Sequence, residues 1–331
     1  MSDIDIIKNI IISYKNKDDE KFLNAVKKYI EKEKLKKHNS VVKELEALIN
    51  NDKPFLNKNK FKETLPIPRD SEKGFKLLEL KTYNYSFDDL KIDDNIKEQL
   101  NQIIMEFKYA EVFSTYNIRY KNKILLCGKP GTGKTFSAQI VSSVLNIPLV
   151  YIRFDSIISS YLGETANNLR KVFDFLENDL WIVLFDEFDI IAKNRDDSHE
   201  HGEIKRVVNN FLQMLDNFNG DSIIFAATNH HNLLDPAIWR RFDDVIYYNL
   251  PDIKIRKSLF ESYLKIIKRN NIDLDFLAKE SAGLSPSDIK MVVTEAVKMT
   301  VINSKDTVDN KTINIALNKF IQREKIKNNK K

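Results

Sequence analysis

The chain has 331 residues, of which 42% are hydrophobic and 10% aromatic, enough to bury the cores of roughly two or three globular units. Its net charge of +5 is small beside 31% charged residues, and lysines are interleaved with acids, which argues against a nucleic-acid partner. The single cysteine, Cys127, excludes an internal disulfide, and no apolar run approaches the ~20 residues that span a bilayer. We therefore expect a cytoplasmic protein without a membrane segment or membrane partner.

Residues 1–50 are predicted to form a helical, adaptor-like region. Apolar residues recur at helical spacing over residues 4–11, 22–30 and 41–49, and Ser40 is a suitable N-cap for the third segment. Three short amphipathic helices can form a small bundle. The sequence offers no chemistry here, so the bundle either only packs on the rest of the protein or acts as a module that docks substrate.

Residues 51–82 form a polar, proline-punctuated linker that can add a short strand near residues 75–80. From residue 83 to residue 250, short apolar runs alternate with helical patterns. This alternation predicts an α/β domain with a mostly parallel sheet and helices on both faces, in which ligands bind at the carboxyl ends of the strands. The runs expected as strands are residues 124–127, 149–154, 181–185, 223–227 and 245–250.

Residues 251–331 return to helical patterns and end in a basic tail. Helical periodicity covers residues 252–267 and 273–281. Ser285 is a suitable N-cap and Pro286 suits the first helical position, so a further helix is expected to begin there.

A phosphate-binding loop is predicted between the first core strand and a helix at residues 136–145, because the stretch matches the pattern G-x-x-x-x-G-K-[ST]. Three of the chain's 8 glycines lie in it, as close approach of backbone N–H groups to phosphate at a helix N-terminus requires. We expect Lys134 to reach the outer phosphates and the Thr135 hydroxyl to ligate Mg²⁺. The alternative is a glycine turn without a ligand. The stretch comprises Gly128, Lys129, Pro130, Gly131, Thr132, Gly133, Lys134 and Thr135.

Asp186 and Glu187 directly follow the apolar run 181–185. Because a bare buried charge is costly, an acid pair at the end of a buried strand needs a partner, and Mg²⁺ with ATP phosphates supplies one. We expect Asp186 to hold the metal largely through its water, and Glu187 to orient and deprotonate the attacking water. The alternative is that both acids only cap the following helix.

Asn229 ends the run 223–228. This position places its amide near the γ-phosphate, where it can hold the attacking water. The alternative is an asparagine that starts a loop and has no such role.

Arg240 and Arg241 precede the strand expected at Val245. An arginine from a neighbouring subunit can stabilise transition-state charge, a contribution of ~10³–10⁵ in rate. The pair therefore predicts an active site shared between subunits, with a solvated surface pair as the alternative.

Together these motifs resemble the AAA family of ATPases, within the AAA+ class, from residue 83 to the last helices. The phosphate loop alone is shared by many NTPases, but the ordered set is specific to the family. The resemblance implies a P-loop three-layer αβα core at 83–250, a helical lid at 251–331, ATP and Mg²⁺ as cofactors, and a homo-oligomer, expected to be a hexamer. The remaining elements, in chain order, are residues 86–90 (SFDDL), 186–189 (DEFD), 227–229 (ATN) and 240–243 (RRFD).

Residues 160–165 (SYLGET) resemble the central-pore loop of the family. By this resemblance Tyr161 and Leu162 grip a polypeptide, and the protein is an ATP-driven machine that remodels, unfolds or translocates protein substrates. The chain looks most like stand-alone bacterial members, some of which are encoded beside a subtilisin-like protease and linked to phage defence. A nucleotide-gated assembly or signalling switch is the alternative, and nucleic-acid remodelling is less favoured because it needs a basic channel.

The chain departs from the family pattern at three places. Pro286 stands where the family usually has Gly, which puts the local nucleotide contact in question but not the fold. Lys129 stands where Pro is usual, in the variable interior of the loop. Lys91 and Ile92 replace a usual Gly pair, so adenine contacts there do not carry over.

Overall fold

The computed structural model describes residues 3–15, 19–35, 66–71, 74–154, 157, 162–188, 201–230, 234 and 236–328. The chain divides into two compact units, Met1–Phe61 and Lys62–Lys331. The helix expected at residues 41–49 and most of the linker lie outside the described residues. None of the helices in the described ranges combines the length and the apolar character that a bilayer crossing requires.

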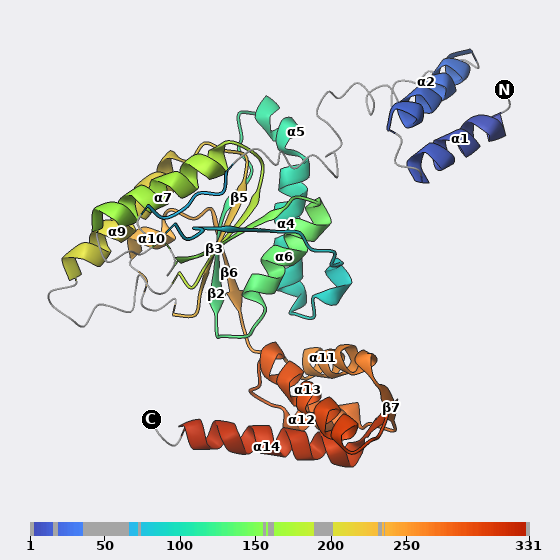
Figure 1. Cartoon of the computed structure of the whole chain (residues 1–331), viewed down its shortest axis with the longest axis vertical. Helices are drawn as coiled ribbons and strands as arrows, with labels where there is room; N and C mark the ends of the chain where they lie inside the picture. The colour runs from blue at the N-terminus through green and yellow to red at the C-terminus, as the bar shows by residue number, and fades with distance from the viewer. Residues whose placement is uncertain are drawn as a thin grey trace. The chain divides into compact units, whose positions relative to one another are not determined.

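The first unit contains α1 (Asp3–Lys15) and α2 (Asp19–Leu35). Both helices were expected from the spacing of their apolar residues, and Figure 1 shows them side by side as a hairpin. Ile6 of α1 and Ile30 of α2 are buried, and the rings of Tyr14 and Phe22 lie 6.3 Å apart. The apolar faces of the two helices therefore pack against each other.

In the described part of the second unit, six strands form one sheet in the order β1-β3-β4-β5-β2-β6. The short edge strand β1 pairs antiparallel with β3, whereas the other neighbours pair parallel. The expected strands are confirmed, with ends that differ by a few residues. Their bounds are β1 (Glu79–Lys81), β2 (Lys123–Gly128), β3 (Leu149–Arg153), β4 (Ile182–Asp186), β5 (Ile223–Thr228) and β6 (Asp244–Tyr248).

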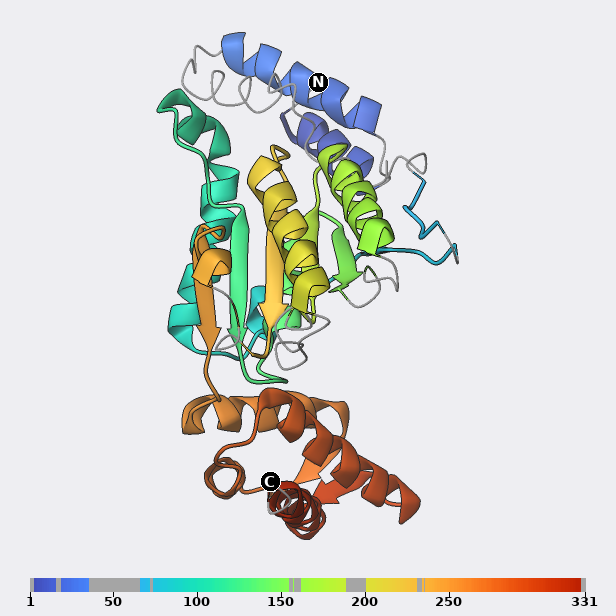
Figure 2. The same ribbon diagram turned by 90° about the vertical axis from the view of Figure 1, so that its left-hand side faces the viewer.

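Helices cover both faces of this sheet, which confirms the three-layer arrangement. On one face α7 (Leu162–Glu177) and α9 (His201–Asn217) pack on alternate strand residues such as Val183 and Phe185 (Figures 1 and 2). On the other face α4 (Asp94–Lys108) and α6 (Lys134–Leu145) pack on the intervening residues, such as Ile182 and Leu184. Because both faces are buried, the strands appear in the sequence as continuous apolar runs. The short elements η1 (Phe87–Asp89) and α5 (Ala110–Thr115) pack on the face of α4 and α6, and α10 (Pro236–Trp239) packs on the face of α7 and α9.

An aromatic cluster fills the layer under α7 and α9. Phe211 of α9 lies 5.1 Å, ring centre to ring centre, from both Phe185 and Phe188. Phe188, which follows Glu187, also meets the ring of Phe242 at 6.3 Å and nearly at right angles. The segment after β4 and the segment before β6 therefore touch through side chains in the core.

The C-terminal helices share a separate hydrophobic core, to which Phe260, Val293 and Leu317 contribute. The expected start of α13 is confirmed: the Ser285 hydroxyl accepts from the N–H of Asp288, whose carboxylate accepts in return from the N–H of Ser285. A short parallel pair, β7 with β8, was not predicted. The elements are α11 (Ile253–Tyr263), η4 (Leu264–Ile266), β7 (Lys268–Asn270), α12 (Leu274–Glu280), α13 (Pro286–Ile302), β8 (Thr307–Asp309) and α14 (Asn310–Asn328).

We expect Phe211→Ala to lower the free energy of unfolding of the α/β layer by about 3–5 kcal/mol, because it empties the centre of the aromatic cluster. Urea unfolding followed by the fluorescence of Trp181 and Trp239, both in this layer, measures the change. Phe276→Ala in α12 is the control, since that ring is 44% exposed and its loss should cost under about 1 kcal/mol. Equal losses for the two variants would contradict the central role of Phe211.

Candidate functional site

The predicted phosphate loop connects β2 to α6, and its backbone demands glycine. Gly128, Gly131 and Gly133 have φ angles of 144°, 75° and 108°, a region that L side chains rarely adopt. A Cβ on Gly128 would also run into the backbone carbonyl of Tyr248 in β6. Within the loop, Lys129 and Pro130 are exposed. Thr132 is buried, and its hydroxyl donates to the carbonyl of Lys129 at 2.8 Å.

Lys134, the first residue of α6, ties the loop to the neighbouring strand. Its Nζ donates to the carbonyls of Gly128 at 2.8 Å and Lys129 at 2.9 Å. It also donates to Oδ1 of Asn229, directly after β5, at 2.9 Å. The side chain is only 7% exposed, so its charge is held by these oxygens instead of by water. Lys134 and Asn229, predicted separately, are thus brought together.

The predicted acid pair meets the loop at the end of β4. Oδ2 of Asp186 accepts from the Thr135 hydroxyl at 2.9 Å, and Oδ1 accepts from the N–H of Glu187 at 2.9 Å. Glu187 is exposed and has a φ of 56°, which is unusual for a residue with a side chain. Such backbone strain is often found at functional sites. One hydroxyl and one carboxylate suit Mg²⁺, which commonly takes one or two protein oxygens together with phosphate and water oxygens.

Tyr151 of β3 also belongs to this group and was missed by the sequence analysis. Its hydroxyl donates to Oδ2 of Asp186 at 3.3 Å. Burial, followed by the charge of Asp186, raises the pKa of Tyr151 to about 12, so the hydroxyl keeps its proton at neutral pH. The signal in the sequence was that Tyr151 places one hydroxyl within the otherwise apolar run 149–152.

Cys127, one residue before the loop, is fully buried in β2. Burial raises the pKa of its thiol to about 12. The thiol is therefore protonated at neutral pH and packs as a small hydrophobic side chain.

The start of α13 contacts the phosphate loop. The N–H of Ser287 donates to the carbonyl of Gly131 at 3.2 Å. Pro286, which replaces the usual glycine, occupies the first helical position, where its missing N–H costs little. The contact with the loop is thus made by the backbone of the next residue.

Arg240 and Arg241 lie at the opposite end of the sheet. β6 runs parallel to β2 with Asp244 opposite Ile124, so the residues before Asp244 lie at the amino ends of the strands. The length of β6 alone separates them from the phosphate loop by roughly 13 Å. Of the predicted residues that the structure describes, these two are not brought to the loop of the same chain. Arg240 is exposed, whereas Arg241 donates to Asp216 of α9 at 3.3 Å.

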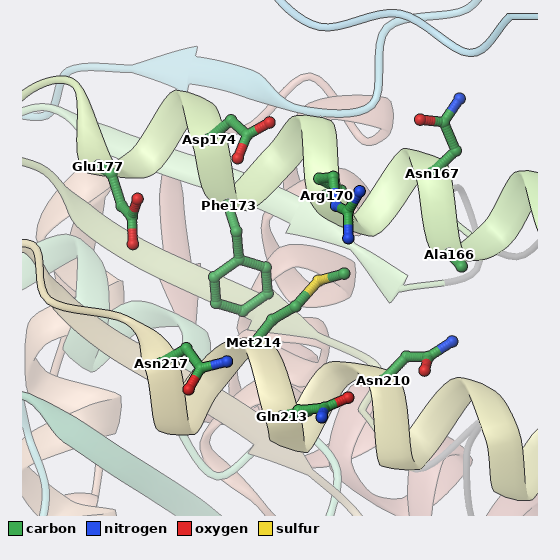
Figure 3. Close-up of a pocket in the computed structure, with 10 residues that line it drawn as sticks. All are labelled: Ala166, Asn167, Arg170, Phe173, Asp174, Glu177, Asn210, Gln213, Met214 and Asn217. Atoms are coloured by element: carbon green, nitrogen blue, oxygen red, sulfur yellow. The ribbon is translucent and has the colours of Figure 1, made fainter.

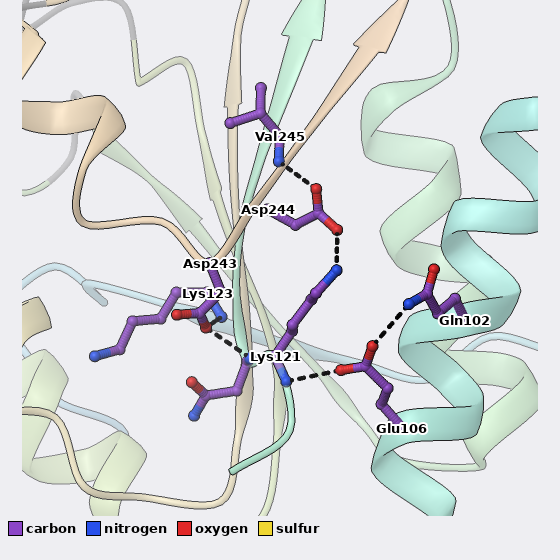
Figure 4. A network of polar contacts seen from close by, with 8 residues as sticks. Gln102, Glu106, Lys121, Lys123, Asp243, Asp244 and Val245 are labelled. Carbon is purple, nitrogen blue, oxygen red and sulfur yellow. Dashed lines mark hydrogen bonds and ion pairs between the residues drawn. The ribbon is translucent and has the colours of Figure 1, made fainter. Parts of the chain in front are cut away.

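A polar network fixes the segment that follows the arginine pair (Figure 4). Asp243 accepts from the backbone N–H groups of Asn122 and Lys123 at 3.0 and 2.9 Å. Lys121 donates to Asp244 at 2.8 Å, and this hydrogen bond raises the pKa of Lys121 above its usual value. The Arg240–Asp243 motif is therefore anchored to the beginning of β2.

Tyr161, the aromatic residue of the predicted pore loop, lies outside the described residues. Leu162 begins α7, but its side chain is not described. A polar groove of about 580 Å³ runs between α7 and α9 and begins at Ala166 of α7 (Figure 3). The sequence analysis did not anticipate it, although amides at helical spacing were its signal. The polar side chains along it are Asn167, Arg170, Asp174, Glu177, Asn210, Gln213 and Asn217.

Comparison with known proteins gives matches over the region that holds the phosphate loop, the acid pair and the arginine pair. The model of the family "ATPase family associated with various cellular activities (AAA)" matches residues 124–250. An uncharacterized AAA family ATPase of Sinorhizobium fredii is 34% identical over 322 residues, which cover 95% of this chain and 94% of the relative.

Two further relatives are longer than the region they share with this chain. A proteasome-activating nucleotidase of Saccharolobus islandicus is 34% identical over 237 residues, 69% of this chain and 60% of that protein. A putative cell division cycle ATPase of Plasmodium falciparum is 34% identical over 219 residues, 63% of this chain and 18% of that protein.

We expect Gly131→Ala to weaken ADP binding by roughly tenfold or more, since left-handed alanine costs about 1–2 kcal/mol and its Cβ would crowd α13. That Cβ would lie 2.7 Å from Cβ of Ser287 and 2.8 Å from Oγ of Ser285. Titration of the full chain with a fluorescent ADP analogue measures the loss.

Gly283→Ala is the matched control. Its φ of 83° is similar, but no heavy atom lies within 4 Å of the added Cβ. This variant should lose some stability and keep its ADP affinity. The same loss of affinity in both variants would show that crowding against α13 is not the cause.

Proposed function

The chain belongs to the AAA family of ATPases, and from that premise we propose that it forms a ring, with six subunits, that remodels, unfolds or translocates protein substrates through a central pore. The observation that carries the proposal is the separation of two motifs: the phosphate loop and the arginine pair lie at opposite ends of one sheet. The similarity to a proteasome-activating nucleotidase supports a protein substrate.

ATP hydrolysis is assigned to the residues gathered at the carboxyl ends of β2, β4 and β5. Bound Mg²⁺-ATP supplies the phosphoanhydride bond that is broken, and the metal neutralises charge on the phosphates. The loop, with Lys134, would hold the phosphates, while Thr135 and Asp186 would hold the metal. Glu187, exposed beside this group, would orient the attacking water and take up its proton. Asn229 would fix both Lys134 and the water, since its amide already contacts the ammonium.

The arginine pair would complete the site of a neighbouring subunit. Within one chain the sheet holds Arg240 away from the phosphate loop, whereas a head-to-tail contact between copies can bring one chain's amino edge to the next chain's loop. Arg240, which is exposed, is the better candidate for contact with the neighbour's phosphate. Arg241 is held by Asp216 and would orient the motif.

Mixing two inactive variants tests the shared site. Arg240→Ala/Arg241→Ala and Glu187→Gln should each lose at least roughly 100-fold in turnover, because each lacks one half of the machinery. In a mixed ring about a quarter of the sites would combine an intact Glu187 with an intact arginine pair, so turnover should recover. Phosphate release is measured against the mixing ratio. A mixture no more active than the sum of its parts would place the complete site within one chain.

Work on the substrate is assigned to Tyr161 and Leu162, by resemblance to the pore loop of the family. Tyr161 precedes α7 and Leu162 begins it, and α7 packs on β4, the strand that ends in the acid pair. A partner protease and a role in phage defence belong to the same proposal and rest on the resemblance to stand-alone bacterial members. Without threading, the chain would act as a nucleotide-gated switch.

Substrate capture separates threading from switching. Tagged Glu187→Gln should bind ATP without turnover and retain protein substrates from a cell lysate. The double variant Glu187→Gln/Tyr161→Ala should keep ATP binding and assembly, measured by fluorescence and by sedimentation, but lose the retained proteins. Retention of the same proteins by both variants would rule out the grip of Tyr161.

A further inference from the structure

The hydrolysis scheme above gives no role to Tyr151, although its hydroxyl contacts the Asp186 carboxylate. Tyr151 is the third residue of β3, opposite Leu184 of β4 and Glu79 of β1. Because strand side chains alternate, Leu184 and Asp186 point to the same face of β4. Tyr151 packs against the core cluster of that face. Its hydroxyl therefore reaches diagonally along the sheet to Asp186, a spacing that aromatic side chains can bridge.

The carboxylate of Asp186 is fixed at both oxygens. Oδ1 accepts from the backbone N–H of Glu187, and Oδ2 accepts from the hydroxyls of Thr135 and Tyr151. Thr135 is itself the expected metal ligand, and the N–H of Glu187 is the neighbouring peptide group. The Tyr151 hydroxyl is thus a donor from another strand that orients the carboxylate independently of the phosphate loop.

The ring of Tyr151 has support that does not depend on its hydroxyl. Nζ of Lys81, on the edge strand β1, lies 4.4 Å from the ring centre, a cation–π contact. Lys81 in turn pairs with Glu79 at 2.6 Å. A phenylalanine at position 151 would keep the ring, its core packing and the cation above it, and would lose only the hydrogen bond to Asp186.

We propose that Tyr151 is a positioning residue that holds the Asp186 carboxylate in the orientation for binding Mg²⁺. The inference rests on the proposed role of Asp186. Mg²⁺ requires nearly ideal octahedral geometry, so a carboxylate free to rotate binds it less well. Hydrogen-bond partners of metal-binding groups commonly contribute 10–100-fold to metal affinity, and less is expected where the carboxylate acts largely through water.

The test compares nucleotide binding with and without metal in the full chain. A fluorescent ADP analogue is titrated in EDTA, and then at fixed analogue concentration with increasing Mg²⁺. In EDTA, Tyr151→Phe should bind the ADP analogue within about twofold of the wild-type affinity and keep the wild-type melting temperature. It should need roughly three- to tenfold more Mg²⁺ for the half-maximal fluorescence change. Tyr120→Phe is the matched control, because Tyr120 donates to the carbonyl of Asp221 at 2.6 Å near the other end of the sheet.

Asp186→Asn distinguishes failure of this inference from failure of the site assignment. If Asp186→Asn shifts the Mg²⁺ dependence and Tyr151→Phe does not, Tyr151 has no positioning role. If neither variant shifts it, Asp186 does not bind the metal. If Tyr151→Phe also loses binding in EDTA or melts earlier, its role is structural. The proposal is supported if Tyr151→Phe shifts the Mg²⁺ dependence, Tyr120→Phe does not, and both variants keep their binding in EDTA.

Discussion

The geometry of the site depends on the hydrogen bonds made by the nearly buried ammonium of Lys134. A buried charge is tolerated only with polar partners, and this one is held by two carbonyls of its own loop and the amide of Asn229. The loop is thereby folded back over the end of β2 and joined to β5. The hydrogen bond between Thr135 and Asp186 adds β4 to the same group. Three strands therefore end at one polar cluster, as the parallel sheet requires.

Much of this fold could be predicted because its local signals agree. Strands buried on both faces appear as unbroken apolar runs, the phosphate loop carries the glycines that its positive φ angles demand, and Ser285 and Pro286 mark the start of α13. The placement of Arg240 and Arg241 was also implied by the sequence, since residues that precede a parallel strand lie at its amino end. The roles of the site residues stay predictions, because they concern bound groups and neighbouring copies.

What could not be predicted depends on contacts between distant segments. Tyr151 joins Asp186 only because β3 lies beside β4 in one particular register, and neither strand alone specifies its neighbour. Asp243 caps the N–H groups of residues some 120 positions earlier, a pairing with no local signature. The β7–β8 pair has strands of three residues each; β7 is polar and exposed, and β8 buries only Val308, so no periodicity marks either strand.

The contact between Phe188 and Phe242 joins the segment of the acid pair to the segment of the arginine pair. Phe188 follows Glu187 and Phe242 follows Arg241, so one aromatic contact links the backbone of the acid motif to that of the arginine motif. In a ring, the first motif would serve a chain's own nucleotide and the second its neighbour's. A packed core shifts between discrete arrangements and does not deform smoothly. In the proposed ring, this aromatic contact would therefore join the motif at one nucleotide to the motif that reaches the next.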